Sequence, residues 1–331
     1  MTPTSSDERM RHAAVLLHQV ATEFTAAGAT ADDLFTDWLH DVPAALRDAL
    51  DAVVELPDRT SGWRVLSGLL NEFGAPGPTP EHWRKASSRL TEPLDVALVL
   101  LAGAIGRVFG WEGQQDGRLV HNIVPSKGYE HLQVGASSTT PLAWHTEDAF
   151  HPQRAELIML ACVRNDDRIG SQVSSVRRIG LTDHEVDVLS RPGLRIAPDD
   201  SYPEQSTPDG VRDNGIPTVW IAEDGPCLRY DPSYTTFLGE DEELRTLHGT
   251  LEQRLTACRE VVPVVAGDVL LIDNDIAVHG RAAFEPRYDG TDRWLKRTMV
   301  RLDRPRPEAE SAEHGFGQLL VGPQPALEVR S

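Results

Sequence analysis

The sequence predicts a mainly β protein with flanking helices, built around a β-sandwich or barrel of the jelly-roll kind. Two observations predict this class. Between about residues 117 and 302, short runs rich in Val, Ile and Leu alternate with turn residues, which is typical of antiparallel sandwiches and barrels. Before this region, residues 7–110 carry apolar side chains at helix-like spacing, and this spacing favours amphipathic helices.

The N-terminal part, residues 1–112, is expected to be mostly helical and to pack on the β core. Its first helix is indicated by the apolar positions Ala13, Val15, Leu16, Val20 and Phe24. A second apolar helix is expected over about 94–109, with Gly110 as its C-cap. The stretch 74–80 holds three prolines and two glycines, so it is predicted to be a loop.

The β core is predicted over residues 113–303, with an insertion over about 182–250 that is mixed in character. Within the insertion, residues 196–219 read as a long loop, and such loops often act as lids. The C-terminal tail, residues 304–331, is expected to pack loosely or to be disordered. The whole chain is expected to form one structural domain. The expected strands are 119–124, 157–163, 172–176, 218–221, 261–265, 269–272 and 298–302.

Composition excludes several classes of protein. The formal net charge is −19, and an acidic surface repels nucleic-acid phosphates and anionic membranes. The three cysteines form no CxxC pair, which argues against a disulfide framework and a structural zinc site. No secretory signal and no apolar run long enough for a bilayer is visible. We therefore expect a cytoplasmic enzyme without nucleic-acid or membrane partners.

Two motifs predict a metal centre. Positions i and i+2 of a strand face the same side, so His145 and Glu147 would present an imidazole and a carboxylate together. His279 follows the expected strand 269–272. Two histidines and one carboxylate suit non-haem iron and leave positions open for a 2-oxoacid and O2. His151 is an alternative ligand, but its distance from His145 in the sequence favours a supporting or structural role.

A third motif predicts an anion site. Arg293 lies fourteen residues after His279, and a guanidinium binds a carboxylate such as the distal one of 2-oxoglutarate through two parallel hydrogen bonds. The alternative is a solvated basic strand edge, because many cations gather here. If Arg293 has no such role, the chain would be a jelly-roll metalloenzyme that does not use 2-oxoglutarate. If the metal triad is unused, it would be a non-catalytic binding protein on the same fold. The clustered cations are Arg287, Arg293, Lys296, Arg297 and Arg301.

The motifs WHTEDAFHP, IDNDIAVHGR and RYDGTDRWLKR resemble those of the clavaminate synthase-like oxygenases. Within this family the sequence is most similar to the free amino acid hydroxylases, such as the arginine β-hydroxylase of viomycin biosynthesis and the asparagine oxygenases. The resemblance extends over about residues 114–302. It implies a double-stranded β-helix (jelly-roll) core, a requirement for Fe(II), 2-oxoglutarate and O2, and a role in antibiotic biosynthesis.

The resemblance also assigns residues to the metal and the co-substrate. His145, Glu147 and His279 match the iron ligands of the family. Arg293 matches the arginine that binds 2-oxoglutarate. Ser171 stands near the position of a threonine whose hydroxyl helps to hold the same carboxylate.

For the amino acid substrate, Arg297 matches an arginine that receives the α-carboxylate. Gln114 matches a glutamine that receives the α-amine together with Glu147, and Gln115 is the alternative one residue along. Asp231 fits the first of two aspartates that contact a guanidinium in arginine-hydroxylating relatives. Asp231 would alternatively be a turn residue before a proline.

The second of these aspartates is replaced by Ser233. This departure favours a less basic relative of arginine, such as citrulline, or a cyclic guanidino amino acid such as enduracididine. The predicted activity is therefore Fe(II)- and 2-oxoglutarate-dependent hydroxylation of free arginine, or of a related guanidino or ureido amino acid, at C3 or C4. The alternative outcome is desaturation of the same class of substrate.

Overall fold

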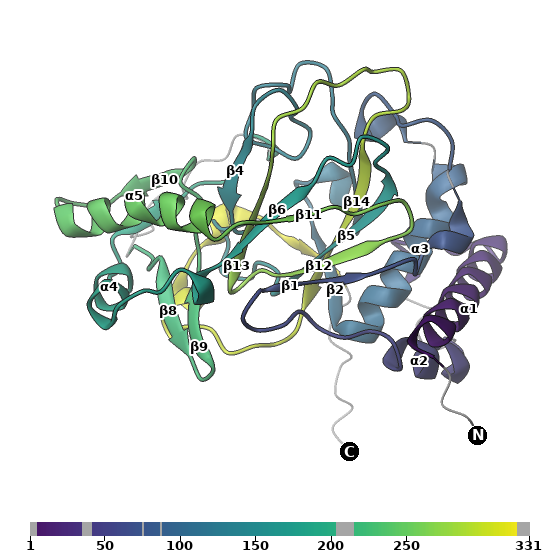
Figure 1. Cartoon of the computed structure of the whole chain (residues 1–331), viewed down its shortest axis with the longest axis horizontal. Coiled ribbons are helices and arrows are strands. Elements are labelled where there is room, and N and C mark those ends of the chain that lie inside the picture. Colours follow the sequence, from purple (N-terminus) through teal and green to yellow (C-terminus); the bar gives the residue numbers. More distant parts are fainter. Residues whose placement is uncertain (1–4, 35–41, 75, 87, 203–214, 323–331) are drawn as a thin grey trace.

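The computed structural model describes residues 5–34, 42–74, 76–86, 88–202 and 215–322. Figure 1 shows strands in the middle of the molecule, with α1–α3 on one side and α4 and α5 on the other. The predicted mainly β fold with flanking helices is therefore confirmed. No helix within these ranges combines the length and the hydropathy that crossing a bilayer would require. The α-helices are α1 Ser6–Ala26, α2 Ala44–Asp51, α3 Ser88–Ile105, α4 Asp183–Leu189 and α5 Glu242–Ala257.

The larger sheet has seven strands within the described ranges, in the order β1-β12-β5-β14-β2-β15, and β3 also pairs with β14. All of these pairings are antiparallel. β14 has neighbours on both sides, so it lies inside the sheet and is not an edge. The strands are β1 Trp63–Leu66, β2 Arg107–Trp111, β3 Val120–Ile123, β5 Leu157–Arg164, β12 Val269–Asp273, β14 Trp294–Arg301 and β15 Leu320–Val321.

The smaller sheet has four described strands in the order β11-β6-β13-β4, and two strand pairs, β7 with β10 and β8 with β9, complete the β structure of the described residues. Its strands are β4 Leu142–His145, β6 Ser171–Ser175, β11 Glu260–Val262 and β13 Ala277–Arg281. The pairs are β7 Leu194–Ile196, β8 Val219–Ala222, β9 Gly225–Leu228 and β10 Thr235–Phe237. Short 3-10 helices are η3 Asn71–Phe73, η4 Trp83–Lys85, η5 Gln115–Gly117, η6 Val176–Arg178, η7 Glu308–Ala312 and η8 Gly315–Gly317.

Alternation along the strands of the larger sheet divides the apolar core in two. In β5, Ile158 and Leu160 belong to the cluster shared with Val173 and Val278 of the smaller sheet. Their neighbours in β5 face the other way, toward the helices, because side chains alternate across a strand. The larger sheet therefore has one face on the smaller sheet and one on α1 and α3. The helix-side cluster includes Leu157, Met159, Trp294, Leu17 and Leu98.

A buried ion pair also fastens β14 to the helical layer. Nζ of Lys296 lies 2.6 Å from Oδ1 of Asp95 in α3, and Lys296 is fully buried. Lys296 therefore faces the helices, as Trp294 does. Arg293, Leu295 and Arg297, at the alternate positions, line a cavity on the opposite face of the sheet.

The predicted helix over 94–109 is wrong at both ends. α3 begins at Ser88 and stops at Ile105, and Arg107 already begins β2. At Gly106 the chain passes so close to β14 that a Cβ would lie 2.3 Å from the carbonyl oxygen of Arg301. Gly110 is consequently a strand residue and not a C-cap. Short apolar runs fit a buried strand as well as a helix, which explains the error. The N-terminal part also contains β1, which was not expected.

The remaining strand predictions agree with the structure except at some ends. β11 stops at Val262, short of the expected residue 265, and β14 begins at Trp294, before the expected residue 298. The described residues of the expected loop 74–80 form neither helix nor strand. The predicted lid, residues 196–219, begins where β7 ends, but residues 203–214 lie outside the described ranges.

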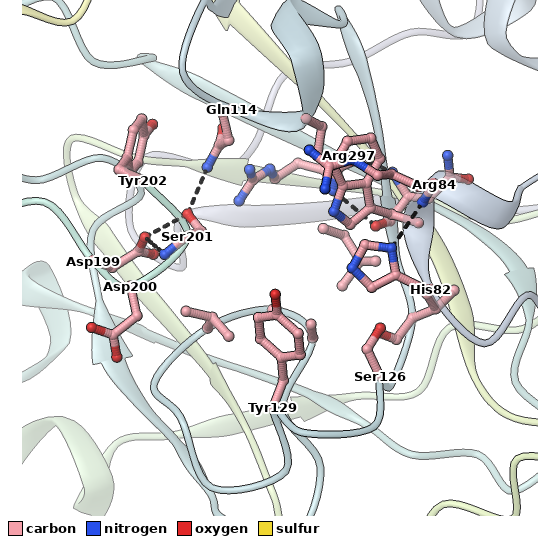
Figure 2. A pocket seen from close by; sticks show the side chains of 18 of the residues that line it. His82, Arg84, Gln114, Ser126, Tyr129, Asp199, Asp200, Ser201, Tyr202 and Arg297 are labelled. Carbon is pink, nitrogen blue, oxygen red and sulfur yellow. Dashed lines mark hydrogen bonds between the residues drawn. The ribbon is translucent and has the colours of Figure 1, made fainter. Parts of the chain in front are cut away.

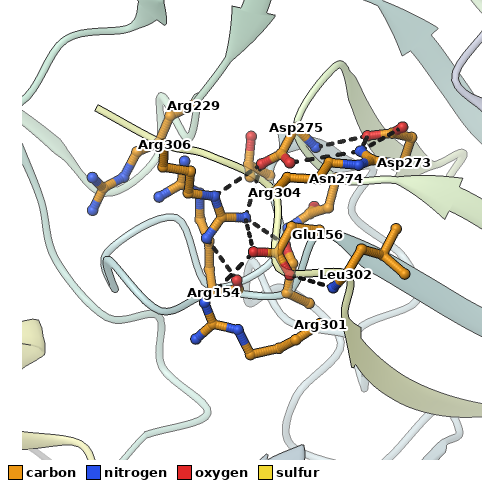
Figure 3. Close-up of polar contacts among 12 residues, drawn as sticks. Arg154, Glu156, Arg229, Asp273, Asn274, Asp275, Arg301, Leu302, Arg304 and Arg306 are labelled. Carbon is orange, nitrogen blue, oxygen red and sulfur yellow. Dashed lines mark hydrogen bonds and ion pairs between the residues drawn. The ribbon is translucent and has the colours of Figure 1, made fainter. Parts of the chain in front are cut away.

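The C-terminal tail up to residue 322 is docked on the core, in contrast to the loose packing that we expected. Oε2 of Glu310 lies 2.8 Å from Nη1 of Arg154, which is fully buried. Arg306 reaches back to Asp275 at 2.8 Å (Figure 3). Each of these contacts joins charges that are distant in the sequence, so a segment rich in Pro and Glu becomes ordered. Residues 323–331 lie outside the described ranges.

Candidate metal centre and adjoining cavities

Three of the predicted ligands meet at the smaller sheet. His145 ends β4 and is the cross-strand partner of His279 in β13, and their ring centroids are 4.2 Å apart. One potential ligand atom from each of His145, Glu147 and His279 lies within 4.8 Å of the others. His151 is not part of this group, and its Nδ1 accepts a hydrogen bond from the Gln153 amide at 3.0 Å.

Glu147 reaches the site by a different route from the one that alternation predicts. β4 ends at His145, and a side chain takes over the role of a strand partner. Oδ1 of Asn274 accepts the Glu147 amide at 2.8 Å, and Nδ2 of Asn274 donates to the Glu147 carbonyl at 3.1 Å. Asp148 then adopts a left-handed conformation with φ of 52°. Asn274 therefore fixes the backbone that aims the carboxylate.

The donor set fits a divalent metal. Nδ1 of His145 lies 2.9 Å from the carbonyl oxygen of Ala143. Because a carbonyl can only accept a hydrogen bond, Nδ1 carries the proton and donates, and Nε2 keeps a free lone pair. Burial, followed by His279, lowers the pKa of His145. Burial alone would raise the pKa of Glu147, but Arg297 and both histidines lower it far below its usual range. Two imidazoles and one carboxylate are ligands that suit Fe(II).

A cavity of about 60 Å³ adjoins these three side chains. Its wall includes Arg293 and Ser171, and Nη2 of Arg293 donates to Oγ of Ser171 at 2.9 Å. Burial lowers the pKa of Arg293 to about 10, and within the described residues it forms no ion pair with a carboxylate. Its Nε is buried without a partner. A buried cation with unused donors is suited to an anionic ligand, and the burial of Arg293 contradicts a solvated strand edge at this position.

A second cavity of about 410 Å³ lies next to the first and shares Arg297 with it (Figure 2). On its wall, Nε2 of Gln114 donates to Oγ of Ser201 at 3.3 Å, while Oε1 of Gln114 is buried without a partner. The amide of Gln115 is already engaged, because it bonds both backbone groups of Asn122, at 2.9 and 3.0 Å. Of the two glutamines, Gln114 is therefore the one with a free acceptor in the cavity.

Arg297 and Glu147 form a buried ion pair at the boundary between the two cavities. Nη1 of Arg297 donates to Oε1 of Glu147. The other oxygen, Oε2, lies 3.4 Å from Nε2 of His279. One carboxylate oxygen of Glu147 therefore faces Arg297, and the other faces His279 in the candidate metal centre.

The sequence around this site matches a known family. The profile of the taurine catabolism dioxygenase TauD, TfdA family matches residues 95–299. The chain belongs to the TauD/TfdA family of dioxygenases. It is 35% identical over 274 residues to the L-ornithine/L-arginine 3-hydroxylase of Catenulispora acidiphila, covering 74% of this chain and 80% of the relative. The enduracididine beta-hydroxylase of Streptomyces hygroscopicus is 34% identical over 267 residues, 73% of this chain and 77% of that protein.

A solved structure agrees with this assignment. The non-haem iron oxygenase OrfP, in complex with Fe and α-ketoglutaric acid, is similar to this dioxygenase with a TM-score of 0.74 and 34% identity. The match covers 88% of this chain and 92% of OrfP. The predicted resemblance to amino acid hydroxylases is therefore confirmed, as is the enzyme class, a non-haem iron dioxygenase that uses 2-oxoglutarate.

The acidic residues of this dioxygenase are placed differently from the expectation. Asp231 is not part of either cavity wall. Its Oδ1 accepts the amide of Ser233 at 3.1 Å, as a turn residue would, and burial raises its pKa to about 6. Asp199, which the sequence did not single out, lines both cavities. The only signal for it was an Asp-Asp pair within the expected lid loop.

Proposed function

We propose that this dioxygenase hydroxylates a free amino acid, either arginine or a related guanidino or ureido amino acid such as citrulline or enduracididine, at C3 or C4. The observation that carries the proposal is the presence of two buried arginines, Arg293 and Arg297, on the wall beside the three candidate ligands. One arginine serves each of two carboxylates, that of the co-substrate and that of the amino acid. The names of both relatives describe hydroxylation of basic amino acids.

In this proposal, His145, Glu147 and His279 hold Fe(II). Arg293 and Ser171 hold the distal carboxylate of 2-oxoglutarate through hydrogen bonds. When bound, iron with 2-oxoglutarate and O2 supplies the oxidising power that an unactivated C–H bond requires. The protein contributes a cavity whose lining includes Glu147, His279 and two arginines, all of them buried. We also propose that the larger sheet and the smaller sheet together form the double-stranded β-helix core implied by the resemblance.

The substrate is oriented by groups around the second cavity. Arg297 receives the α-carboxylate, and the free Oε1 of Gln114 together with Glu147 receives the α-ammonium group. Asp199 supplies a negative charge to a cationic side chain, since it faces both cavities. Asp231 would act on the substrate side chain less directly, because it is not part of the wall of either cavity. The carbon held nearest the metal reacts, so these contacts select between C3 and C4.

The test is incubation of anaerobically iron-loaded protein with 2-oxoglutarate, O2 and single free amino acids. The panel holds arginine, citrulline, homoarginine, enduracididine, lysine, ornithine and asparagine, and mass spectrometry reads product and succinate together. We expect one guanidino or ureido member to gain one oxygen with matching succinate. Loss of two hydrogens would instead indicate desaturation. If Fe(II) and 2-oxoglutarate bind but no member stimulates succinate formation, the proposed substrate class is wrong.

A further inference from the structure

His121 in β3 is fully buried, and both of its ring nitrogens have partners. Nε2 lies 2.9 Å from the carbonyl oxygen of Arg118, and Nδ1 lies 2.9 Å from Nη2 of Arg297. His121 and Arg297 are also direct cross-strand partners in the pairing of β3 with β14. The contact is therefore set by the strand register, because partners in a ladder project to the same face.

The partners determine the tautomer of His121. A carbonyl only accepts, so Nε2 must carry the proton, and a guanidinium only donates, so Nδ1 must offer its lone pair. His121 is consequently neutral and acts as an acceptor toward Arg297. In agreement, burial and then the charge of Arg297 lower the pKa of the His121 imidazole to about 3.

A neutral acceptor suits an arginine that has to bind an anion. An arginine side chain has many rotamers, and within the described residues only Glu147 and His121 accept hydrogen bonds from its guanidinium. A substrate ammonium group competes for Glu147, and His121 then still holds the guanidinium in place. A carboxylate at position 121 would also hold it, but would neutralise its charge. The imidazole fixes the direction of the remaining donors and leaves the charge available.

We propose that His121 is a positioning residue that orients Arg297 for a free α-carboxylate, and that it thereby contributes to the selection of amino acids over derivatives without this group. The part of this inference that concerns the selection of amino acids rests on the function proposed above, and its measurements need a substrate. The orientation itself is a property of the protein alone and can be measured without turnover.

Two variants separate orientation from packing. His121→Phe keeps a planar ring but removes the acceptor, whereas His121→Asn places Oδ1 where Nδ1 was. For the panel member that wild type oxidises, kcat and KM are measured with the amino acid and with its carboxamide, which lacks the negative charge. We expect His121→Phe to raise KM for the acid about tenfold or more, as the loss of a hydrogen bond to a charged group predicts. Its preference for the acid over the amide falls by a similar factor.

His121→Asn should stay close to wild type, and neither variant should change KM for 2-oxoglutarate or the affinity for Fe(II). These last two measurements show that the fold and the first cavity are intact. Equal losses in both variants, an unchanged preference for the acid, or a parallel rise in KM for 2-oxoglutarate would each overturn the proposal.

A second measurement does not depend on a substrate. In the full chain labelled with 15N-histidine and loaded with Zn(II), the nitrogen shifts of His121 report its tautomer. We expect protonated Nε2 and unprotonated Nδ1, and the Nδ1 shift should change in an Arg297→Gln variant. A protonated Nδ1 would contradict the proposal even if the chain oxidised an amino acid. If no amino acid is oxidised but this tautomer is found, the proposed function fails and the orientation of Arg297 by His121 stands.

Discussion

Arg293 and Ser171 are joined by a hydrogen bond of 2.9 Å between Nη2 and Oγ, although they come from different sheets. Arg293 immediately precedes β14 of the larger sheet, and Ser171 begins β6 of the smaller one. The proposed anion site therefore forms only when the two sheets pack together.

Replacing Arg293 by Ala should raise KM for 2-oxoglutarate about a hundredfold, because the charged donors lost contribute roughly 3 kcal/mol. Ser171→Ala removes a neutral partner and should raise KM only about fivefold. Succinate formation against the concentration of 2-oxoglutarate measures both effects, and Fe(II) affinity serves as the control. Activity of Arg293→Ala without any 2-oxoglutarate would favour a metalloenzyme that does not use this co-substrate.

Fe(II) binding should depend on His145 and not on its neighbour in the sequence, His151. His145→Ala removes one of the three converging ligands, so tight Fe(II) binding should be lost in an anaerobic calorimetric titration. His151→Gln is the matched control, since His151 packs against the ring of Trp111, 4.2 Å between centroids, outside the ligand group. Loss of iron in His151→Gln with retention in His145→Ala would mean that the ligand set is misassigned.

Asp199→Asn should weaken binding of a substrate with a cationic side chain, since the carboxylate faces both cavities. We expect KM for the amino acid to rise on the order of tenfold, because a charge-assisted hydrogen bond becomes a neutral one. Asp200→Asn is the comparison, because Asp200 lines only the second cavity and its Oδ2 accepts from the hydroxyl of Tyr234 at 3.0 Å. Equal effects of the two substitutions would show that only the overall negative charge matters.

Arg154→Met should destabilise the protein by about 3–5 kcal/mol, because Glu310 would be left buried without its principal partner. Urea unfolding of the iron-free protein measures the change. Arg107→Met is the control: it breaks a pair with Asp303 in which the side chains are 54% and 62% exposed, so little change is expected. A small effect at Arg154 would mean that water compensates the buried charge.

His248 should make stability depend on pH. Burial lowers its pKa from 6.5 to about 4, so the unfolded chain binds a proton at a higher pH than the folded one. Stability therefore falls as pH decreases from 6.5 toward 4. At pH 5 the contribution reaches at most about 2 kcal/mol. Urea unfolding of His248→Phe at pH 7 and pH 5 should show a smaller difference than wild type, and an identical difference would contradict this assignment.

The parts of the structure that the sequence predicted correctly depend on short-range patterns. The run at 157–163 and the run at 269–272 form buried strands because each is apolar and bounded by turn residues. The three candidate ligands, which the fold brings together, could be predicted because His145 and Glu147 are two residues apart and His279 follows a strong strand. The N-terminal helices likewise follow from periodic apolar positions.

The parts that it did not predict depend on partners distant along the chain. The backbone of Glu147 is held by Asn274, 127 residues away in the sequence, and no local sequence pattern predicts this contact. Lys296 was counted only among the cations of a basic strand edge, yet it is buried, because Asp95 in α3 pairs with it across the sheet–helix boundary. A glycine is needed at position 106, directly after α3, because β14 passes close to it. This close approach is also a property of the assembled fold.

The extended backbone of β14 and of the residue before it fixes the distance between Arg293 and Arg297. Arg293 and Arg297 are four residues apart on one face of the chain, which corresponds to about 13 Å at the usual rise of a strand. The two arginines are therefore held at a set separation, and so would be the two carboxylates that we propose they bind. One inserted or deleted residue between them would turn one guanidinium into the helical layer. Longer or shorter substrates must then be accommodated by remodelling the outer wall of the second cavity, while the spacing of the arginines stays constant.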